Sequence, residues 1–305
     1  MKVSIITPCY NAASHIAATV QSIQRQTLND WELILVDDGS TDNTAEVIHE
    51  LAAQDVRIKL LCKSNGGTAS ARQAGLNIAQ GEYIQLLDAD DQIDANKLLR
   101  QTQKMDQEGL DVSYTDWCYI YPDGKKGEIE GMHCSLVRLL AFWGTFGTLP
   151  IHSYMYRRSY LEQHQIRFTT AIREREDWDW HIQVYSASPN VNRIKAYCGA
   201  MYMVSPTGKT AGGKIEKLRG GNLRFLAYEI QNKRGYQRGL LLLRLAIELS
   251  FMLLSAVKYR LWGQVRLLAI FHSSWRERLQ LACAIMLQPI AWVVIVIYII
   301  KTRLQ

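Results

Sequence analysis

Short apolar runs alternate with segments of helical spacing through the first 115 residues. The apolar runs predict strands at residues 3–7, 31–36, 58–62, 83–87 and 111–115. Between them, apolar positions three or four apart predict helices that end near residues 26, 52, 79 and 108. Ser40 or Thr41 can cap the second of these helices. Strands separated by helices imply βαβ units, so we expect an α/β fold with a mostly parallel sheet flanked by helices.

The pattern is less regular over residues 116–213. It predicts a turn, a helix, a strand, a helix, a strand and a glycine-rich loop, at residues 121–124, 135–143, 151–157, 174–185, 193–204 and 205–213. The regular alternation thus ends near residue 115, and the strand-containing pattern ends near residue 213.

Residues 214–305 have helical spacing and long apolar stretches. The stretch 239–254 is interrupted only by Arg244 and Glu248, and the 22 residues of 279–300 carry no charge. A helix of that length is about 33 Å long, and the hydrocarbon core of a membrane is about 30 Å thick. A full span is one interpretation. A shallow insertion is another, because Pro289 removes a helix hydrogen bond, and a helix buried against the rest of the protein is a third.

Charge divides the chain in a similar way. The net charge is +6, but residues 231–305 hold 11 Lys and Arg against two Glu, which leaves −3 for residues 1–230. Basic residues diluted among Leu, Ile and Val, without a nucleic-acid-reading motif, favour a membrane surface and no nucleic acid. Six scattered cysteines and the lack of an N-terminal signal pattern predict that the body lies in the cytosol. Residues 214–305 are thus predicted to attach the chain to the cytoplasmic face of a membrane.

Three polar clusters follow predicted strands, at residues 7–11, 37–42 and 88–91. We expect them at the carboxyl edge of the sheet, where open α/β folds bind ligands. Asp88 and Asp90 suit a hard cation that also holds phosphate oxygens, although an acidic turn before a helix has the same pattern. Residues 37–42 can accept hydrogen bonds from a base or ribose, or they can form an ordinary βα turn. Residues 65–68 with Arg72 can form a backbone nest and a cation for a pyrophosphate.

The order of these motifs is more specific than any one of them. Neither GxGxxG nor GxxxxGK[ST] is present. The motifs lie in the segments Val3–Asn11, Trp31–Asp42, Asn65–Arg72 and Gly81–Asp91. In order and spacing the chain resembles the family 2 inverting glycosyltransferases over residues 1–115. The resemblance continues more loosely to about residue 205, where Arg173–Trp180 looks like the Glu-Asp motif of that family.

This resemblance implies a fold and a set of residue roles. The fold would be of the GT-A type, one Rossmann-like domain with a nucleotide-sugar half at 1–115 and an acceptor half at 116–213. The nucleotide sugar would be bound by Thr7, Pro8, Tyr10, Asp38, Gly66, Arg72 and Asp88. Asp38 would hold the base, and Asp90 would bind a divalent cation, Mn²⁺ or Mg²⁺, that bridges the diphosphate. Asp177 would be the general base for the acceptor hydroxyl.

Several residues of the acceptor half leave alternatives open. The other acids near Asp177 that compete for the role of base are Glu174, Glu176 and Asp179, and the cluster also suits an ordinary helix N-terminus. Trp178 and Trp180 can stack on an acceptor or belong to the core.

Two motifs common in the family are absent. Family members often carry a metal-binding His in the loop after the last strand, but residues 204–207 contain none. His152 and His181 are other histidines of the acceptor half, but neither matches the family's position, and a structural role is the alternative for each. Of the two, His152 is retained as a lesser candidate. The chain also lacks the Gln-x-x-Arg-Trp motif of processive members, which favours transfer of a single sugar.

The resemblance and the basic tail together predict a membrane-associated, inverting, metal-dependent glycosyltransferase. It would move one sugar from a nucleotide diphosphate sugar, UDP-linked, to a hydroxyl of a saccharide acceptor. A lipid-linked saccharide in surface polysaccharide assembly is the expected acceptor. The alternatives are a nucleotidyltransferase, for which Asp177 would be dispensable, and a catalytically inactive membrane assembly factor that keeps the fold.

Overall fold

The computed structural model describes most of the first 204 residues and short stretches after them. The described residues are 1–129, 131, 134–142, 150–171, 175–204, 225–226, 228–229, 232–237 and 239–245. The chain divides into two compact units, Met1–Leu139 with Trp143–Gly213, and Leu140–Phe142 with Lys214–Gln305. The sheet and its helices belong to the first unit.

The first half of this unit is a parallel sheet of four strands in the order β3-β2-β1-β4. It matches the alternation of apolar runs and helices that the sequence predicts. Its elements are β1 (Val3–Cys9), α1 (Ile16–Gln24), β2 (Trp31–Asp37), α2 (Thr44–Gln54), β3 (Ile58–Cys62), α3 (Thr68–Ile78) and β4 (Tyr83–Leu86).

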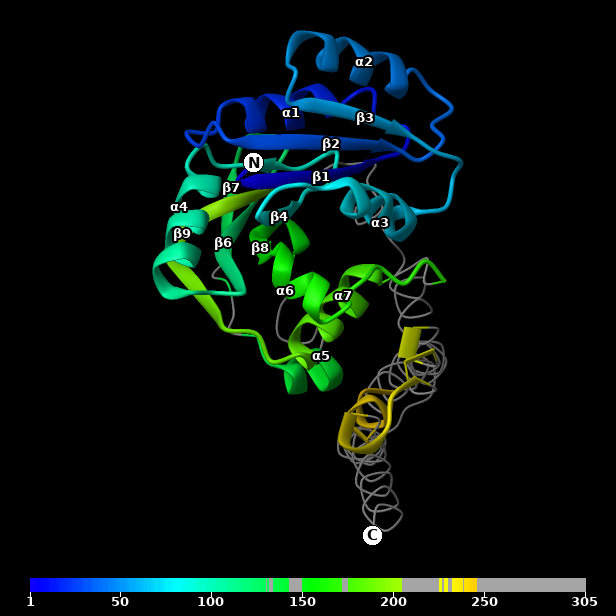
Figure 1. Ribbon diagram of the computed structural model, residues 1–305, viewed down its shortest axis with the longest axis vertical. Coiled ribbons are helices and arrows are strands. Elements are labelled where there is room, and N and C mark those ends of the chain that lie inside the picture. The colour runs from blue at the N-terminus through cyan, green and yellow to red at the C-terminus, as the bar shows by residue number, and fades with distance from the viewer. Residues whose placement is uncertain are drawn as a thin grey trace, which may run out of the picture. The chain divides into compact units, whose positions relative to one another are not determined.

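Helices cover both faces of this parallel sheet (Figure 1). Both faces must be covered at the centre of the sheet, because all seven residues of β2 are buried. On one face, Ile5 of β1 shares an apolar cluster with Ile16 of α1 and Ile48 of α2. On the other face, Gly75 of α3 lies so close to Ile6 that a β-carbon at residue 75 would be 2.5 Å from the Ile6 side chain.

The second half continues the same sheet with strands of mixed direction. Strand β8 pairs antiparallel with β4, and the order continues β8-β6-β9-β5, with β7 also paired to β6. Only β6 and β9 are parallel among these described strands. The elements are β5 (Gln92–Ile93), α4 (Lys97–Glu108), β6 (Val112–Ile120), β7 (Lys126–Ile129), α5 (Leu136–Phe142), the 3₁₀ helix η1 (Ile151–Ser153), β8 (Tyr154–Arg157), α6 (Arg158–Gln163), α7 (Glu176–Ser186) and β9 (Val191–Met203).

The predicted α/β fold is confirmed, but the sheet is mixed beyond β4. Apolar periodicity identifies a strand without giving its direction, so the antiparallel pairings were not predicted. Strand β5, strand β7 and helix α6 were also missed. Strand β5 has two residues and α6 has six, which is too short for a clear period, and β7 has only one apolar residue, Ile129. Helix α2 begins at Thr44 after Asn43, whereas Ser40 donates a hydrogen bond to Asp37 and caps no helix.

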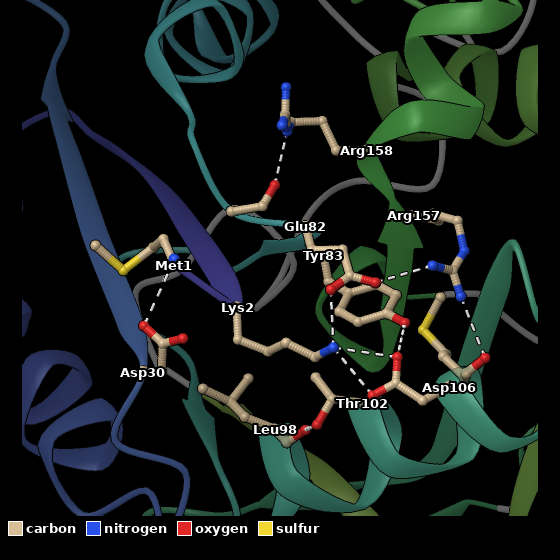
Figure 2. A network of polar contacts seen from close by, with 12 residues as sticks. Met1, Lys2, Asp30, Glu82, Tyr83, Leu98, Thr102, Asp106, Arg157 and Arg158 are labelled. Carbon is tan, nitrogen blue, oxygen red and sulfur yellow. Dashed lines mark hydrogen bonds and ion pairs between the residues drawn. The ribbon is translucent and has the colours of Figure 1, made fainter.

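A polar network connects four elements at the end of the sheet where the parallel strands begin (Figure 2). Lys2 Nζ donates to Glu82 Oε2 at 2.8 Å and to Asp106 Oδ1 at 3.1 Å. Arg157 donates to the other oxygen of Glu82 at 3.0 Å, and the Tyr83 hydroxyl donates to Asp106 at 2.5 Å. The network joins β4, α4 and β8 to Lys2, the residue just before β1, at the end opposite the carboxyl ends of the parallel strands.

The described residues of the second unit include a helical stretch at 239–245 and helical residues between 225 and 237. Lys233 and Glu229 form an ion pair there at 3.8 Å. Within the part of the chain that the structure describes, no helix is both long enough and apolar enough to cross a membrane. The predicted membrane segment at 279–300 lies outside the described residues, as do the loop at 205–213 and most of 239–254.

Candidate active site

The loops after β1 and β2 meet at the carboxyl edge of the sheet. The two strands stay in parallel register to their last residues, so the loops leave side by side. The Thr41 N–H donates to Asn11 Oδ1 at 2.8 Å, and the Asn11 N–H donates to Ser40 Oγ at 3.0 Å. Strand β4 ends at this same edge, and the acidic segment Asp88–Asp91 follows it.

Buried Asp38 organises the loop that precedes α3. Its Oδ2 accepts the Gly67 N–H at 2.7 Å, and its Oδ1 accepts the Gly66 N–H at 3.0 Å and Lys63 Nζ at 2.6 Å. Gly67 has a φ of +86°, and a β-carbon on Gly66 would be 2.7 Å from Ser70 Oγ, so both positions need glycine. Asp38 therefore shapes the loop, and its contact with a nucleotide base stays a prediction.

The three residues predicted to line the nucleoside pocket differ in exposure. Tyr10 is 52% exposed and Pro8 is half-buried. Thr7 is buried, and its hydroxyl has no hydrogen-bond partner among the described residues. Tyr10 is thus open to a ligand at the protein surface, whereas Thr7 lies beneath it. Their role in binding stays a prediction.

Arg72 connects the two halves of the domain. It lies in α3 with 3% of its side chain exposed, and it contacts Asp88 Oδ1 at 2.5 Å and Glu176 Oε1 at 3.3 Å. Asp88 follows β4 in the first half, and Glu176 begins α7 in the second. Burial alone would lower the pKa of Arg72, but the charges of Asp88 and Glu176 raise it overall, so the guanidinium remains positive.

Two acids at the start of α7 are candidates for a general base. Burial raises the pKa of Glu176 and of Asp177, and the positive charge of Arg72 partly offsets this effect in both. Arg175, which has a φ of +68° just before the helix, offsets it further for Asp177. A carboxylate with a raised pKa is a stronger base at neutral pH than an ordinary one, so the environment suits proton abstraction.

Asp179 has a structural role that separates it from these two acids. It is 3% exposed, and its Oδ2 accepts hydrogen bonds from Thr169 Oγ1 and Gln183 Nε2, both at 2.7 Å. The bond from Thr169 joins α7 to the segment before it, and the bond from Gln183 lies within α7. Glu174, the fourth acid of the cluster, lies outside the described residues.

Both tryptophans of α7 belong to the core. Trp178 and Trp180 have no exposed surface. The Trp178 indole donates to the Leu139 carbonyl oxygen at 2.6 Å, and Trp180 stacks on Phe168 with ring centroids 4.2 Å apart. Of the two interpretations that the sequence left open, the structure favours core packing over an acceptor platform.

Asp88, Asp91 and His152 form a cluster beside Arg72. One ligand atom from each lies within 4.8 Å of the others. Asp91 Oδ2 is 3.0 Å from His152 Nδ1 without hydrogen-bond geometry, and among the described residues neither this oxygen nor His152 Nε2 has a hydrogen-bond partner. Two carboxylates, one imidazole and two unsatisfied buried atoms suit a divalent cation such as Mn²⁺.

Asp90 is the exposed member of the acidic segment. Partial loss of hydration, followed by the negative charges of Asp91 and Asp88, raises the pKa of Asp90 to about 6. Its role as the cation ligand stays a prediction, because the clustered ligand atoms come from Asp88, Asp91 and His152.

Sequence reasoning identified the acidic segment but did not single out Asp91. The side chain of Asp91 is buried and bonded through Oδ1 to the Met203 N–H at 3.1 Å, a contact across more than 100 positions. No spacing in the chain indicates that contact. The adjacent acids Asp90 and Asp91 are the one sequence feature that could have indicated a role for Asp91, because an ordinary solvated turn does not need two acids in a row.

Comparison with known proteins places these features in a family. Residues 4–178 match the family described as glycosyl transferase family 2. The uncharacterized glycosyltransferase EpsJ of Bacillus subtilis is 30% identical over 200 residues, which are 63% of this chain and 58% of EpsJ. The putative teichuronic acid biosynthesis glycosyltransferase TuaG of the same species is 39% identical over 123 residues, 40% of this chain and 49% of TuaG. The matches thus span about half the length of these relatives.

Two solved structures have the same fold. The 1–349 segment of TarS from S. aureus, in complex with UDP-GlcNAc, has a TM-score of 0.62 and 21% identity, covering 82% of this chain and 73% of that segment. The mannosyltransferase PcManGT from Pyrobaculum calidifontis, in complex with GDP-Man and Mn²⁺, has a TM-score of 0.63 and 17% identity, covering 98% of this chain and 85% of PcManGT. At these identities the likeness concerns the fold, which is of the GT-A type. The family match over more than half of the chain shows that this protein belongs to glycosyl transferase family 2.

Proposed function

We propose that the chain is an inverting, non-processive glycosyltransferase that moves one sugar from a UDP-sugar to a hydroxyl of a saccharide acceptor. The observation that carries this proposal is Arg72, which is buried between Asp88 of the acidic segment and Glu176 of the α7 acid pair. The Arg72 guanidinium thereby links the acidic segment, which suits a cation-bound diphosphate, to the α7 acid pair, which suits a general base. TarS in complex with UDP-GlcNAc supports the UDP-sugar as donor.

Each part of the site has a role in the transfer. The acceptor oxygen forms a bond to the anomeric carbon as the bond from that carbon to the diphosphate oxygen breaks. The Asp177 carboxylate takes the proton of the acceptor hydroxyl, and Glu176 stays paired with Arg72. The loop of Gly66 and Gly67, held by Asp38, positions the nucleotide side.

Asp88, Asp91 and His152 would hold a divalent cation, Mn²⁺ or Mg²⁺, with Asp90 beside them. When bound, the cation would supply positive charge to the departing diphosphate. PcManGT in complex with Mn²⁺ supports this part of the proposal. The buried His152 Nε2, which has no hydrogen-bond partner among the described residues, also supports it.

The acceptor is proposed from the relatives and from composition. The name of TuaG supports a saccharide in surface polysaccharide assembly, and a lipid-linked form would suit the basic, apolar residues 214–305. We propose that these residues attach the chain to the cytoplasmic face of a membrane, where the site would have access to cytosolic nucleotide sugars.

The proposal is tested with a panel of nucleotide sugars, with and without Mn²⁺, on the wild type and on Asp177→Asn. Loss of the base should lower turnover by about 10²- to 10⁴-fold while nucleotide-sugar binding remains. Asp123→Asn is the control, because Asp123 is an exposed acid of the turn before β7.

Other outcomes would favour the alternatives. Full activity of Asp177→Asn with an inactive Glu176→Gln would move the base to Glu176. Pyrophosphate release from nucleoside triphosphates and a sugar phosphate, unaffected by Asp177→Asn, would indicate a nucleotidyltransferase. Nucleotide-sugar binding without any turnover would indicate a binding factor.

A further inference from the structure

Lys97 is a buried lysine in neutral surroundings. It is the first residue of α4 and has no exposed surface. Its Nζ donates to Gln85 Oε1 and, at 2.5 Å, to Gln101 Oε1. Within the described residues no carboxylate forms an ion pair with it, and burial lowers its pKa well below the usual range. Burying an amine in this way has a large desolvation cost, so the presence of Lys97 at this position needs a structural explanation.

The Lys97 nitrogen fixes which way its amide partners face. It donates to both glutamine oxygens, and a glutamine amide has one accepting oxygen and one donating NH₂. Gln85 and Gln101 must therefore present their oxygens to Lys97, and their NH₂ groups point away from it. Lys97 thus sets the donor direction of two buried amides at once.

The two NH₂ groups bind the backbone around the cation cluster. Gln85 Nε2 donates to the His152 carbonyl oxygen at 3.0 Å and to the Leu86 carbonyl oxygen at 2.7 Å. Gln101 Nε2 donates to the Ser113 carbonyl oxygen at 2.9 Å. Leu86 ends the strand that leads to Asp88. Gln85 consequently joins the backbone of that strand to the backbone of the turn that carries the His152 side chain.

We propose that Lys97 is a positioning residue for the cation site. By orienting Gln85, it fixes the η1 turn so that the His152 side chain stays within reach of Asp88 and Asp91. This inference rests on the proposed function, because it assumes that these three side chains hold a divalent cation.

The test is Mn²⁺ affinity, measured by EPR titration of Mn²⁺ alone with the wild type, Lys97→Met and Gln85→Glu. Lys97→Met removes the donor that orients both amides. Gln85→Glu keeps an acceptor for Lys97 but removes the NH₂ that binds the His152 carbonyl, so it separates the two contacts. Both changes should weaken Mn²⁺ binding by about 10-fold or more, the usual effect of removing a residue that orients a ligand.

Gln26→Glu is the matched control. Gln26 is also buried, and its NH₂ donates to two backbone oxygens, those of Ser22 and Asp94, with no contact to His152. The same substitution there should leave Mn²⁺ affinity within about twofold of the wild type, because the affected backbone belongs to no residue of the cluster. Thermal melting of each variant checks that it is folded, and Gln85→Glu carries the test if Lys97→Met does not fold.

Three results would overturn the inference. Wild-type affinity in folded Gln85→Glu would show that the amide does not position the site. An equal loss of affinity in Gln26→Glu would show a general effect of buried charge. If the wild type itself binds no Mn²⁺, the cation proposal fails, and this inference fails with it.

Discussion

Arg72 determines the electrostatics of the site at the scale of single residues. Its guanidinium is the positive charge that both Asp88 and Glu176 contact directly. It partly offsets the rise in pKa that burial causes in Glu176 and Asp177. The α7 acids therefore depend on a residue of α3, more than 100 positions earlier in the chain, for their protonation state near neutral pH.

This arrangement predicts the pH dependence of activity. Asp177 must be deprotonated to act as a base, and its pKa is raised, so the acidic limb of kcat/KM should lie above the usual range of an Asp side chain. Arg72→Met removes an offsetting positive charge. The pKa of Asp177 should rise further, and the limb should move to higher pH. Profiles of kcat/KM against pH for the wild type and Arg72→Met measure the shift.

Arg100→Met is the control for that measurement. Arg100 is exposed and stacks on Tyr197 with 4.4 Å between its guanidinium and the ring centroid. The Arg100→Met variant should leave the acidic limb of the kcat/KM profile at the same pH as in the wild type. A limb that stays in place in Arg72→Met, or that moves to lower pH, would contradict the assignment of Asp177 as the base.

Part of the site could be predicted from sequence, and the division has a physical cause. Asp88–Asp91 and the acids of α7 are local clusters, so spacing revealed them. The contacts of Arg72 with Glu176 and of Asp91 with His152 join positions 104 and 61 apart, and they depend on the tertiary fold. A motif can indicate that a carboxylate has a function, but only the fold shows which neighbour sets its charge.

At the scale of elements, close packing between α3 and the sheet depends on Gly75. A β-carbon there would be 2.5 Å from Ile6 and 3.2 Å from Val36. Gly75→Ala should gain about 1 kcal/mol in helix propensity but lose about 1–3 kcal/mol through overpacking, for a net loss of stability. Urea denaturation of the wild type and the variant measures the difference. Asn77→Ala, at an exposed position of the same helix, should change stability by less than about 0.5 kcal/mol. A stabilised Gly75→Ala would show that α3 can move away from β1.

The turn between α2 and β3 has an acid-sensitive contact. Arg57 donates to both oxygens of Asp55, at 2.9 and 2.8 Å, and lowers the pKa of Asp55 to about 2. A carboxyl whose pKa is lower in the folded state stabilises the fold above its unfolded pKa near 3.8, and loses that effect as the pH falls toward 2.

Asp55→Asn should therefore lower the free energy of unfolding by about 1 kcal/mol at pH 7, since partial exposure of Arg57 weakens the ion pair. The difference from the wild type should become smaller between pH 5 and pH 3. Urea denaturation across this range is the measurement, with Glu50→Gln, at an exposed acid of α2, as the control. A difference that is constant with pH would assign the effect to hydrogen bonding without charge.

The bounds of the strands show which of them apolar periodicity can predict and which it cannot. Strands β1 to β4 lie within a residue or two of their predicted ends, because each is a short, mostly apolar run, and β1, β2 and β4 are also almost entirely buried. Strand β6 was predicted to end at residue 115 but continues to Ile120. Polar and aromatic residues fill that extension, and its partner β9 contributes a register shift beside Asp116, so no simple alternation marks it.

At the scale of the whole molecule, the uneven charge predicts how the chain distributes between membrane and solution. Full-length protein should sediment with membranes, and a version ending at Arg276 should be largely released. Residues 231–305 hold a net charge of +9 together with the uncharged stretch 279–300, so both electrostatic and apolar attachment should contribute. Fractionation after washes in high salt and then carbonate measures this. Full-length protein as soluble as the truncated form would contradict membrane attachment, and release by salt alone would indicate a peripheral, electrostatic contact.

The place of β9 in the sheet has a consequence for how the protein is made. Residues 3–86 contain all of the parallel strands β1 to β4, so that part of the sheet can pair early during translation. Strand β6 is complete at Ile120, but its partner β9 ends only at Met203. At about 5–20 residues per second, the ribosome needs roughly 4–17 s to supply the missing strand. During that interval one edge of β6 remains unpaired on the nascent chain and open to pairing with other chains, an exposure that ends when β9 emerges and binds.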